Sequence, residues 1–167
     1  NRGHDRRKLE KLLYALRQRV PGVAIRTTVL VGYPGETEEE FMELYDFVKA
    51  FRFERLGVFP YSHEEDTPAA ALQDDIPEQV KQERASRIME LQQEISLEIN
   101  TAKVGKTFRV LIDAEEAEYY TGRTEFDSPE VDNEVLVSKR VILKPGTFVN
   151  VRINDAGEFD LFGEVVV

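Results

Sequence analysis

A run of apolar and β-branched residues, Val23 to Val31, stops abruptly at Gly32 and narrows the fold class more than any other segment. Only Arg26 and two threonines interrupt its apolar character. A strand with this pattern is typical of a parallel sheet that is covered on both faces. We therefore expect an α/β architecture at the start of the chain.

The segment that follows predicts a helix and a second parallel strand. Thr37 and Glu40 have the spacing of a capping box, so a helix should begin there. Residues 55–61, RLGVFPY, have the composition of the next strand. A strand, a helix and a strand at this spacing form one parallel βαβ unit. The buried stripe of its helix should consist of Phe41, Leu44, Tyr45, Val48 and Phe51.

Two more helices flank this unit. One is expected over residues 5–20, and the other from Pro77 to about Asn100, because proline suits the first turn of a helix. Two parallel strands and three helices cannot bury both faces of a sheet. We therefore expect residues 1–76 to be the C-terminal part of a larger α/β barrel, followed by a connecting helix over residues 77–102. The apolar stripe of the first helix should be Leu9, Leu12, Leu13, Leu16 and Val20.

The pattern of the sequence changes after Gly105. Five short alternating runs follow, separated by Gly, Asp, Asn and Pro: TFRVLID, EYYTGRT, EVLVSK, FVNVRIN and DLFGEVVV. Such runs predict a small, all-β, five-stranded antiparallel barrel of the OB-like kind over residues 103–167.

Composition limits the chemistry that the chain itself can supply. Cysteine is absent, which removes disulfides, thiolate metal ligands and cysteine nucleophiles together. Residues 1–102 carry 14 basic and 19 acidic side chains and residues 103–167 carry 8 and 13, so each part has a net charge of −5. Nucleic-acid binders usually show a basic excess, whereas an acidic surface suits a basic partner. With no long apolar run and no basic-then-apolar leader, we expect a cytoplasmic protein without a membrane partner.

The turn after the first strand, Gly32-Tyr33-Pro34-Gly35-Glu36, is the first candidate site. Ligands of α/β proteins bind at the C-terminal ends of parallel strands. The Gly-x-x-Gly spacing alone is a weak signal, because the lysine of a P-loop is missing. A tight βα turn with a helix-capping acid explains the same residues.

Two acidic segments allow further interpretations. His63, Glu64, Glu65 and Asp66 are contiguous and seldom converge on one ion in that arrangement, so we expect a solvated loop and no metal site. Residues 122–135, GRTEFDSPEVDNEV, fit either a charged hairpin loop or an acidic docking surface for a basic protein. No catalytic triad is predicted, since the chain has only two histidines.

Several segments, in order along nearly the whole chain, resemble the C-terminal half of one family, the radical S-adenosylmethionine methylthiotransferases. Within that family, YSHEEDTPAA and GRTEFDSPEVD resemble the branch that modifies ribosomal protein S-twelve of the small subunit. Asp66 and Asn133 depart from the pattern, which has glycine at both positions. The other segments that carry the resemblance are NRGH, IRTTVLVGYPGETEEEF, IPEQVKQER, QQEISLEIN, VGKT and LKPGTFVNVRI.

The resemblance implies that residues 1–76 are the end of a radical S-adenosylmethionine barrel and residues 103–167 a TRAM domain that recognises the substrate. The resemblance also implies that enzymes of this branch use S-adenosylmethionine and two 4Fe-4S clusters to add a methylthio group to the β-carbon of an aspartate. The cluster ligands would lie outside this cysteine-free chain, so the fragment alone should be inactive.

The resemblance also assigns residues to the cofactor and to the substrate. Leu30 and Gly32 are expected beside the adenine, and Phe59 and Tyr61 on the next strand as a wall. The other expected cofactor residues are Arg26 and Thr28, toward the methionyl carboxylate or ribose, and Pro34, Gly35 and Glu36, which shape the turn. The residues expected to dock the basic ribosomal protein are Asp127, Glu130 and Asp132.

Two alternatives remain open from the sequence. The first is the tRNA-modifying branch of the same enzymes, which needs a basic face such as Lys139, Arg140 and Lys144 would provide. The second is a non-catalytic module that binds a basic protein, which would describe the isolated fragment.

Overall fold

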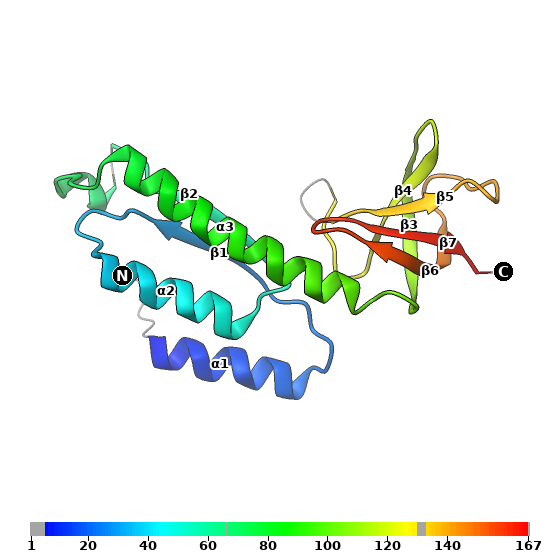
Figure 1. Cartoon of the computed structure of the whole chain (residues 1–167), viewed down its shortest axis with the longest axis horizontal. Coiled ribbons are helices and arrows are strands. Elements are labelled where there is room, and N and C mark those ends of the chain that lie inside the picture. Colours follow the sequence, from blue (N-terminus) through cyan, green and yellow to red (C-terminus); the bar gives the residue numbers. More distant parts are fainter. Residues whose placement is uncertain (1–5, 66, 130–132, 167) are drawn as a thin grey trace.

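The computed structural model describes residues 6–65, 67–129 and 133–166, and it has two parts joined by a long helix (Figure 1). The first part contains a parallel pair of strands, and the second is a closed β-barrel. The helices are α1 (Arg6–Arg19), α2 (Glu38–Phe51), the short 3-10 helix η1 (Pro68–Ala71) and the long α3 (Glu78–Thr101). The strands are β1 (Arg26–Val31), β2 (Arg55–Pro60), β3 (Thr107–Glu115), β4 (Tyr119–Thr124), β5 (Val135–Ser138), β6 (Phe148–Ala156) and β7 (Leu161–Val165).

The first part contains the parallel βαβ unit that the sequence predicts. β1 and β2 pair in parallel, with Leu30 opposite Phe59. α2 begins after Thr37, whose hydroxyl accepts a hydrogen bond from the Glu40 N–H at 3.2 Å, while the Glu40 carboxylate accepts one from the Thr37 N–H at 2.9 Å. The capping box is therefore confirmed.

Helices α2 and α3 pack against one face of this sheet only. Their shared core with β1 is fully buried at Val31, Phe41, Val48 and Ile88. The other face, in the described residues, is exposed at Leu30 and Phe59. The sequence predicted that β1 is covered on both faces. In the described residues helices cover only one face, so this prediction was wrong.

Helix α1 forms as predicted, but its apolar stripe is mostly uncovered. Only Leu13 of the predicted stripe is buried, against Ile25, Phe51 and Phe53. The remaining residues of that stripe, Leu9, Leu12, Leu16 and Val20, are exposed. The prediction of a buried stripe was therefore wrong for most of its members, since the described structure places no element over them.

The barrel has the five predicted strands, in the closed order β3-β4-β5-β7-β6. It is mixed and not antiparallel, because β5 and β7 pair in parallel. The core is formed by inward-facing side chains of all five strands, among them Val110, Tyr120, Val137, Ile153 and Leu161. Closure leaves no free edge among these strands, which suits a small domain.

Helix α3 is fixed to the barrel at its C-terminal end. The Asn100 side chain is fully buried and its Nδ2 donates to the Gly157 carbonyl at 3.1 Å and to the Glu158 carbonyl at 3.3 Å. The Gly105 N–H donates to the Ile153 carbonyl at 2.8 Å.

None of the described helices is both long enough and apolar enough to cross a membrane.

Candidate functional site

The turn after β1 is held by a carboxylate inside it. Gly32 has a φ of 72°, and Glu36 Oε1 accepts a hydrogen bond from its N–H at 3.0 Å. The same oxygen accepts from Arg84 of α3 at 2.7 Å. Gly35, with a φ of 84°, donates its N–H to Asp75 at 2.8 Å. The turn amides of Gly32 and Gly35 are thus engaged within the protein, which supports the role of Glu36 in shaping the turn.

A buried lysine packs beneath this turn. Lys81 is 3% exposed, and its ammonium donates to Asp74 at 2.6 Å and lies 5.2 Å from the ring centre of Tyr61. The hydrogen bond from Lys81 lowers the pKa of the Asp74 carboxyl. A Cβ atom on Gly32 would lie 2.4 Å from Lys81 Cγ, so the turn passes this side chain closely.

Tyr61 continues the wall at the end of β2. It is buried, its N–H donates to the Val31 carbonyl at 2.8 Å, and its ring meets that of Tyr33 edge-on at 5.5 Å. Its hydroxyl is buried without a hydrogen-bond partner among the described residues.

The open face of the sheet brings several of the predicted cofactor residues together. Arg26, Thr28 and Leu30 alternate on it along β1, and Gly57 and Phe59 are opposite Thr28 and Leu30 on β2. Leu30 is 47% exposed and Phe59 is 61% exposed. These two apolar side chains at the C-terminal end of the sheet offer a flat surface of the kind that an adenine ring stacks on.

Arg26 and Thr28 lie toward the other end of β1. A strand rises about 3.3 Å per residue, so Arg26 is roughly 20 Å from Gly32. Arg26 instead contacts the barrel, where it donates to Ser128 Oγ at 3.4 Å. The structure therefore groups Leu30, Phe59 and the turn, and places Arg26 with the second part of the molecule.

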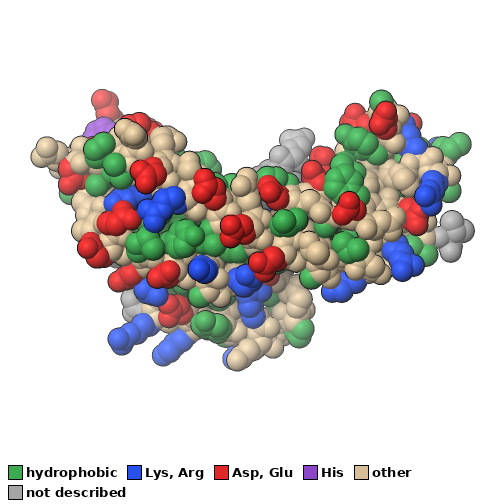
Figure 2. Space-filling model, in the orientation of Figure 1, with side chains coloured by type: hydrophobic (Ala, Val, Ile, Leu, Met, Phe, Trp, Pro, Cys, Tyr) green, Lys and Arg blue, Asp and Glu red, His purple; other side chains and the backbone are tan. Residues whose placement is uncertain are grey.

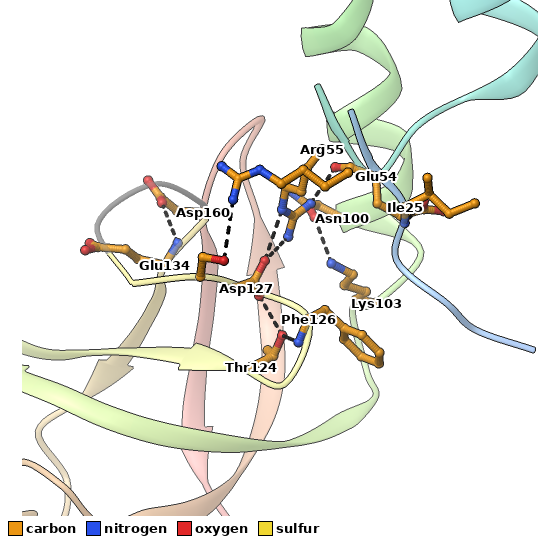
Figure 3. Close-up of polar contacts among 12 residues, drawn as sticks. Ile25, Glu54, Arg55, Asn100, Lys103, Thr124, Phe126, Asp127, Glu134 and Asp160 are labelled. Atoms are coloured by element: carbon orange, nitrogen blue, oxygen red, sulfur yellow. Dashed lines mark hydrogen bonds and ion pairs between the residues drawn. The ribbon is translucent and has the colours of Figure 1, made fainter. Parts of the chain in front are cut away.

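The loop after β4 meets the sheet through a buried ion pair (Figure 3). Arg55, the first residue of β2, donates to Asp127 Oδ1 from Nε at 3.0 Å and also from Nη2. Thr124 donates to Asp127 Oδ2 at 2.5 Å. The two charged side chains are 8% and 1% exposed. Breaking such a pair strongly destabilises a protein because one buried charge is left uncompensated.

This pair corrects the role expected for Asp127. A carboxylate that is 1% exposed and holds an arginine of the same chain does not face a docking partner. The other two predicted docking residues, Glu130 and Asp132, lie outside the described residues. Sequence reasoning did not assign a role to Arg55, although a charged residue at the start of an apolar strand is a signal for a buried pair.

Two charged side chains next to this pair, Glu54 and Lys103, have hydrogen-bond partners of their own. Glu54 accepts from Arg17 at 2.7 Å and from the Ile25 N–H at 2.7 Å. Lys103 donates to Asn100 Oδ1 at 3.1 Å. Burial and the nearby charge of Arg55 lower the pKa of Lys103.

Two further predictions concern a metal site and a basic face. In the described part of the chain no group of three or more His, Asp or Glu side chains is arranged to hold a metal ion, and His63 is exposed in its loop. Lys139 pairs with Glu115 and Arg140 with Glu164. Figure 2 likewise shows acidic and basic side chains interleaved over the visible face. The basic cluster predicted for RNA is thus matched by acids at these two residues.

The barrel matches a known class of domain. Residues 104–166 match the TRAM domain family, which covers β3 to β7. Other matches extend over both the first part and the barrel.

The chain is 56% identical over 164 residues, 98% of its length, to the ribosomal protein uS12 methylthiotransferase RimO of Christiangramia forsetii. It is 55% identical over 99% of its length to the protein of that name from Cytophaga hutchinsonii, and 53% identical over 93% to that from Parabacteroides distasonis. Over nearly its whole length the chain is therefore similar in sequence to these methylthiotransferases. It spans 36%, 38% and 36% of the length of these three relatives.

Proposed function

We propose that the protein containing this chain adds a methylthio group to an aspartate of ribosomal protein uS12. The observation that carries the proposal is the identity of 56% over 98% of the chain with a methylthiotransferase of that name. The similarity continues through both parts of the molecule, because it extends beyond the TRAM segment at residues 104–166. Because a ribosomal protein is found in the cytoplasm, the proposal also places this protein there.

The open face of the sheet is the proposed cofactor surface. Leu30 and Phe59 would hold the adenine of S-adenosylmethionine, with Gly32 in the turn beside it and Tyr61 closing the side. The bound cofactor supplies the radical and methyl-transfer chemistry, while these residues bind it, orient it and exclude water. The two 4Fe-4S clusters would take their ligands from outside this cysteine-free chain.

The acidic charge of the molecule suits the proposed substrate. A net charge of −10 attracts a basic ribosomal protein and increases its rate of encounter at low salt. The barrel, as a TRAM domain, would recognise that protein.

A second candidate function, modification of tRNA, is favoured by one feature of the barrel. The Arg109 guanidinium lies 4.2 Å from the ring centre of Phe148, and Phe148 is 58% exposed. An exposed aromatic ring beside an arginine can stack with a base and contact a phosphate.

One assay separates the two functions. The full-length protein, with its clusters reconstituted, is incubated with S-adenosylmethionine and a reductant, and with either uS12 or bulk tRNA. Mass spectrometry should find one methylthio group on an aspartate of uS12 and none on tRNA. Modification of tRNA alone would replace the proposal by the second candidate.

A matched pair of variants tests the cofactor surface. Phe59→Ala removes a stacking surface and should raise the KM for S-adenosylmethionine about tenfold. Phe162→Ala removes an exposed ring from β7, which is 40% exposed against 61% for Phe59, and should leave that KM unchanged. Equal effects of the two variants would contradict the assignment of the sheet face.

A further inference from the structure

A cavity of about 500 Å³ lies at the joint between the two parts of the molecule. The loop between α1 and β1 forms one wall, the end of α3 a second and the barrel a third. Because Ala24 precedes β1 and Arg55 begins β2, the cavity lies at the N-terminal end of the sheet. The proposed cofactor surface, with Leu30 and Phe59, is at the opposite end. The cavity is therefore a separate site.

The wall of this cavity is basic, although the chain as a whole has a net charge of −10. Four of the described residues in the wall are cationic, and one, Glu54, is acidic. The two arginines, Arg17 and Arg55, are each paired with an acid of the same chain. The other two cations are Lys103 and Lys106, which form no ion pair with an acid among the residues that the structure describes.

A tight turn brings these two lysines together. The Lys106 N–H donates to the Lys103 carbonyl at 3.0 Å, and Gly105 between them has a φ of 84°. The Cα atoms at the two ends of such a turn are less than about 7 Å apart. The Lys103 ammonium has three donors, and within the described part of the chain it uses one, to the neutral Asn100 Oδ1 at 3.1 Å. Donors on both lysines are therefore left for a ligand.

The chain by itself does not fully compensate the charge of Lys103. Figure 3 shows its side chain beside the pair of Arg55 and Asp127. Burial and the positive charge of Arg55 lower the pKa of Lys103, and the opposing effects of Asp127 and Glu54 are smaller. A bound anion would favour the charged form of this lysine.

We propose that this cavity binds a small organic phosphate. A phosphate monoester carries a charge of about −1.5 to −2 at pH 7, which matches two lysines better than the single charge of a carboxylate. Its oxygens accept charge-assisted hydrogen bonds from ammonium groups. A phosphate group fills only part of a cavity of 500 Å³, and much of the remaining wall is apolar, with Val20, Val23 and the half-exposed Phe126. The ligand should therefore carry an apolar or aromatic body next to its phosphate.

This inference goes beyond the proposed function and does not depend on it, because the cavity is separate from the cofactor surface. A ligand in the cavity would contact the α1–β1 loop, α3 and the barrel at once. Since it binds only where these three segments are assembled, it would stabilise their arrangement by mass action.

Isothermal titration calorimetry of the full-length protein tests the site, with phenyl phosphate as the probe in a phosphate-free buffer. Phenyl phosphate should bind at least about fivefold more tightly than inorganic phosphate, which lacks the apolar body, and than benzoate, which carries a single charge. S-Adenosylmethionine should not displace it, since the cofactor surface is at the other end of the sheet. Equal affinities for phenyl phosphate and inorganic phosphate would overturn the proposed class of ligand.

Two variants of the turn and a matched control locate the binding. Lys106→Met should weaken the binding of phenyl phosphate about tenfold, because it removes a charge-assisted hydrogen bond. Lys106 is exposed, so its substitution keeps the test valid even if Lys103→Met, from which we expect a similar loss, fails to fold. Lys144→Met removes the same charge from an exposed residue outside the cavity and should change the affinity less than about twofold.

The outcomes decide the proposal without reference to methylthio transfer. Binding that is weakened by Lys106→Met and not by Lys144→Met supports the site, and no binding of phenyl phosphate, or equal effects of these two variants, would overturn it. Uridine monophosphate as a competitor identifies a nucleotide as the source of the phosphate if it binds more tightly than phenyl phosphate. A 5′-phosphorylated RNA that binds more tightly still would assign the cavity to nucleic acid and overturn the proposal of a small ligand.

Discussion

Gly32 is constrained by its backbone and by its neighbour. Its φ of 72° is unfavourable for any residue with a Cβ, and that Cβ would lie 2.4 Å from Lys81 Cγ. Lys81 cannot easily move, because it is buried and hydrogen-bonded to Asp74. Gly32→Ala should therefore lower the free energy of unfolding by about 2–5 kcal/mol, the sum of backbone strain and overpacking.

Gly22 provides the matched control for this prediction. Its φ is 79°, but a Cβ atom at this position would have no described atom within 4 Å, so Gly22→Ala should cost only the backbone strain of about 1–2 kcal/mol. Urea unfolding followed by circular dichroism measures both variants. Equal losses would show that Lys81 moves aside and that its close approach to Gly32 does not add to the cost of the substitution.

Lys103 makes stability depend on pH in the alkaline range. Burial and the charge of Arg55 lower its pKa in the folded state, so the unfolded state binds the proton more tightly. Stability contributed by this group therefore rises as pH increases toward the ordinary lysine pKa of about 10.4. Lys103→Met lacks the titration, so the unfolding free energy of the wild type minus that of the variant should increase between pH 8 and pH 10. A difference that stays constant or falls over this range would contradict the prediction.

The joint between the sheet and the barrel depends on one ion pair. Asp127→Asn leaves the Arg55 guanidinium buried beside a neutral group, and the loss of a partner in such a pair costs about 3–5 kcal/mol. Asp113→Asn breaks the pair with Arg123 at the barrel surface and should cost less than about 1 kcal/mol. Urea unfolding of the two variants compares these costs.

The same variants test whether the pair fixes the orientation of the two parts. The chain has no cysteine, so spin labels can be attached at cysteines introduced for Glu39 and Glu116, which are exposed on α2 and after β3. Electron paramagnetic resonance should give a narrow distance distribution in the parent and a broader one in Asp127→Asn. An unchanged width would show that other contacts suffice to orient the barrel.

The elements that could be predicted from the sequence are those set by neighbours along the chain. Thr37 and Glu40 are three residues apart, and the capping box formed as expected. The parallel pairing of β5 with β7 joins Val135 with Leu161 and depends on how the barrel closes, which no local pattern contains. For the same reason Asp127 was predicted as a surface acid, because its partner is 72 residues away in sequence.

The two parts of the molecule differ in how completely they bury their own apolar surface. The barrel core contains side chains from β3 to β7 alone and the barrel is closed. The sheet of β1 and β2 has an open face with Leu30 and Phe59 exposed, and α1 leaves Leu12 and Leu16 exposed. Since burial of apolar surface is the main source of stability, the barrel should be the more independent of the two parts.

We therefore predict that residues 100–167 fold when expressed alone, whereas residues 6–102 do not. The shorter segment keeps the bonds of Asn100 to the β6–β7 turn and of Gly105 to Ile153, and domains of this size can fold alone. Loss of Arg55 exposes Asp127 to water, where its charge is solvated. Circular dichroism and urea titration should show cooperative unfolding for residues 100–167 only. If this segment is unfolded while the 167-residue chain is folded, the barrel owes its stability to α3 and Arg55, and the two parts form one folding unit.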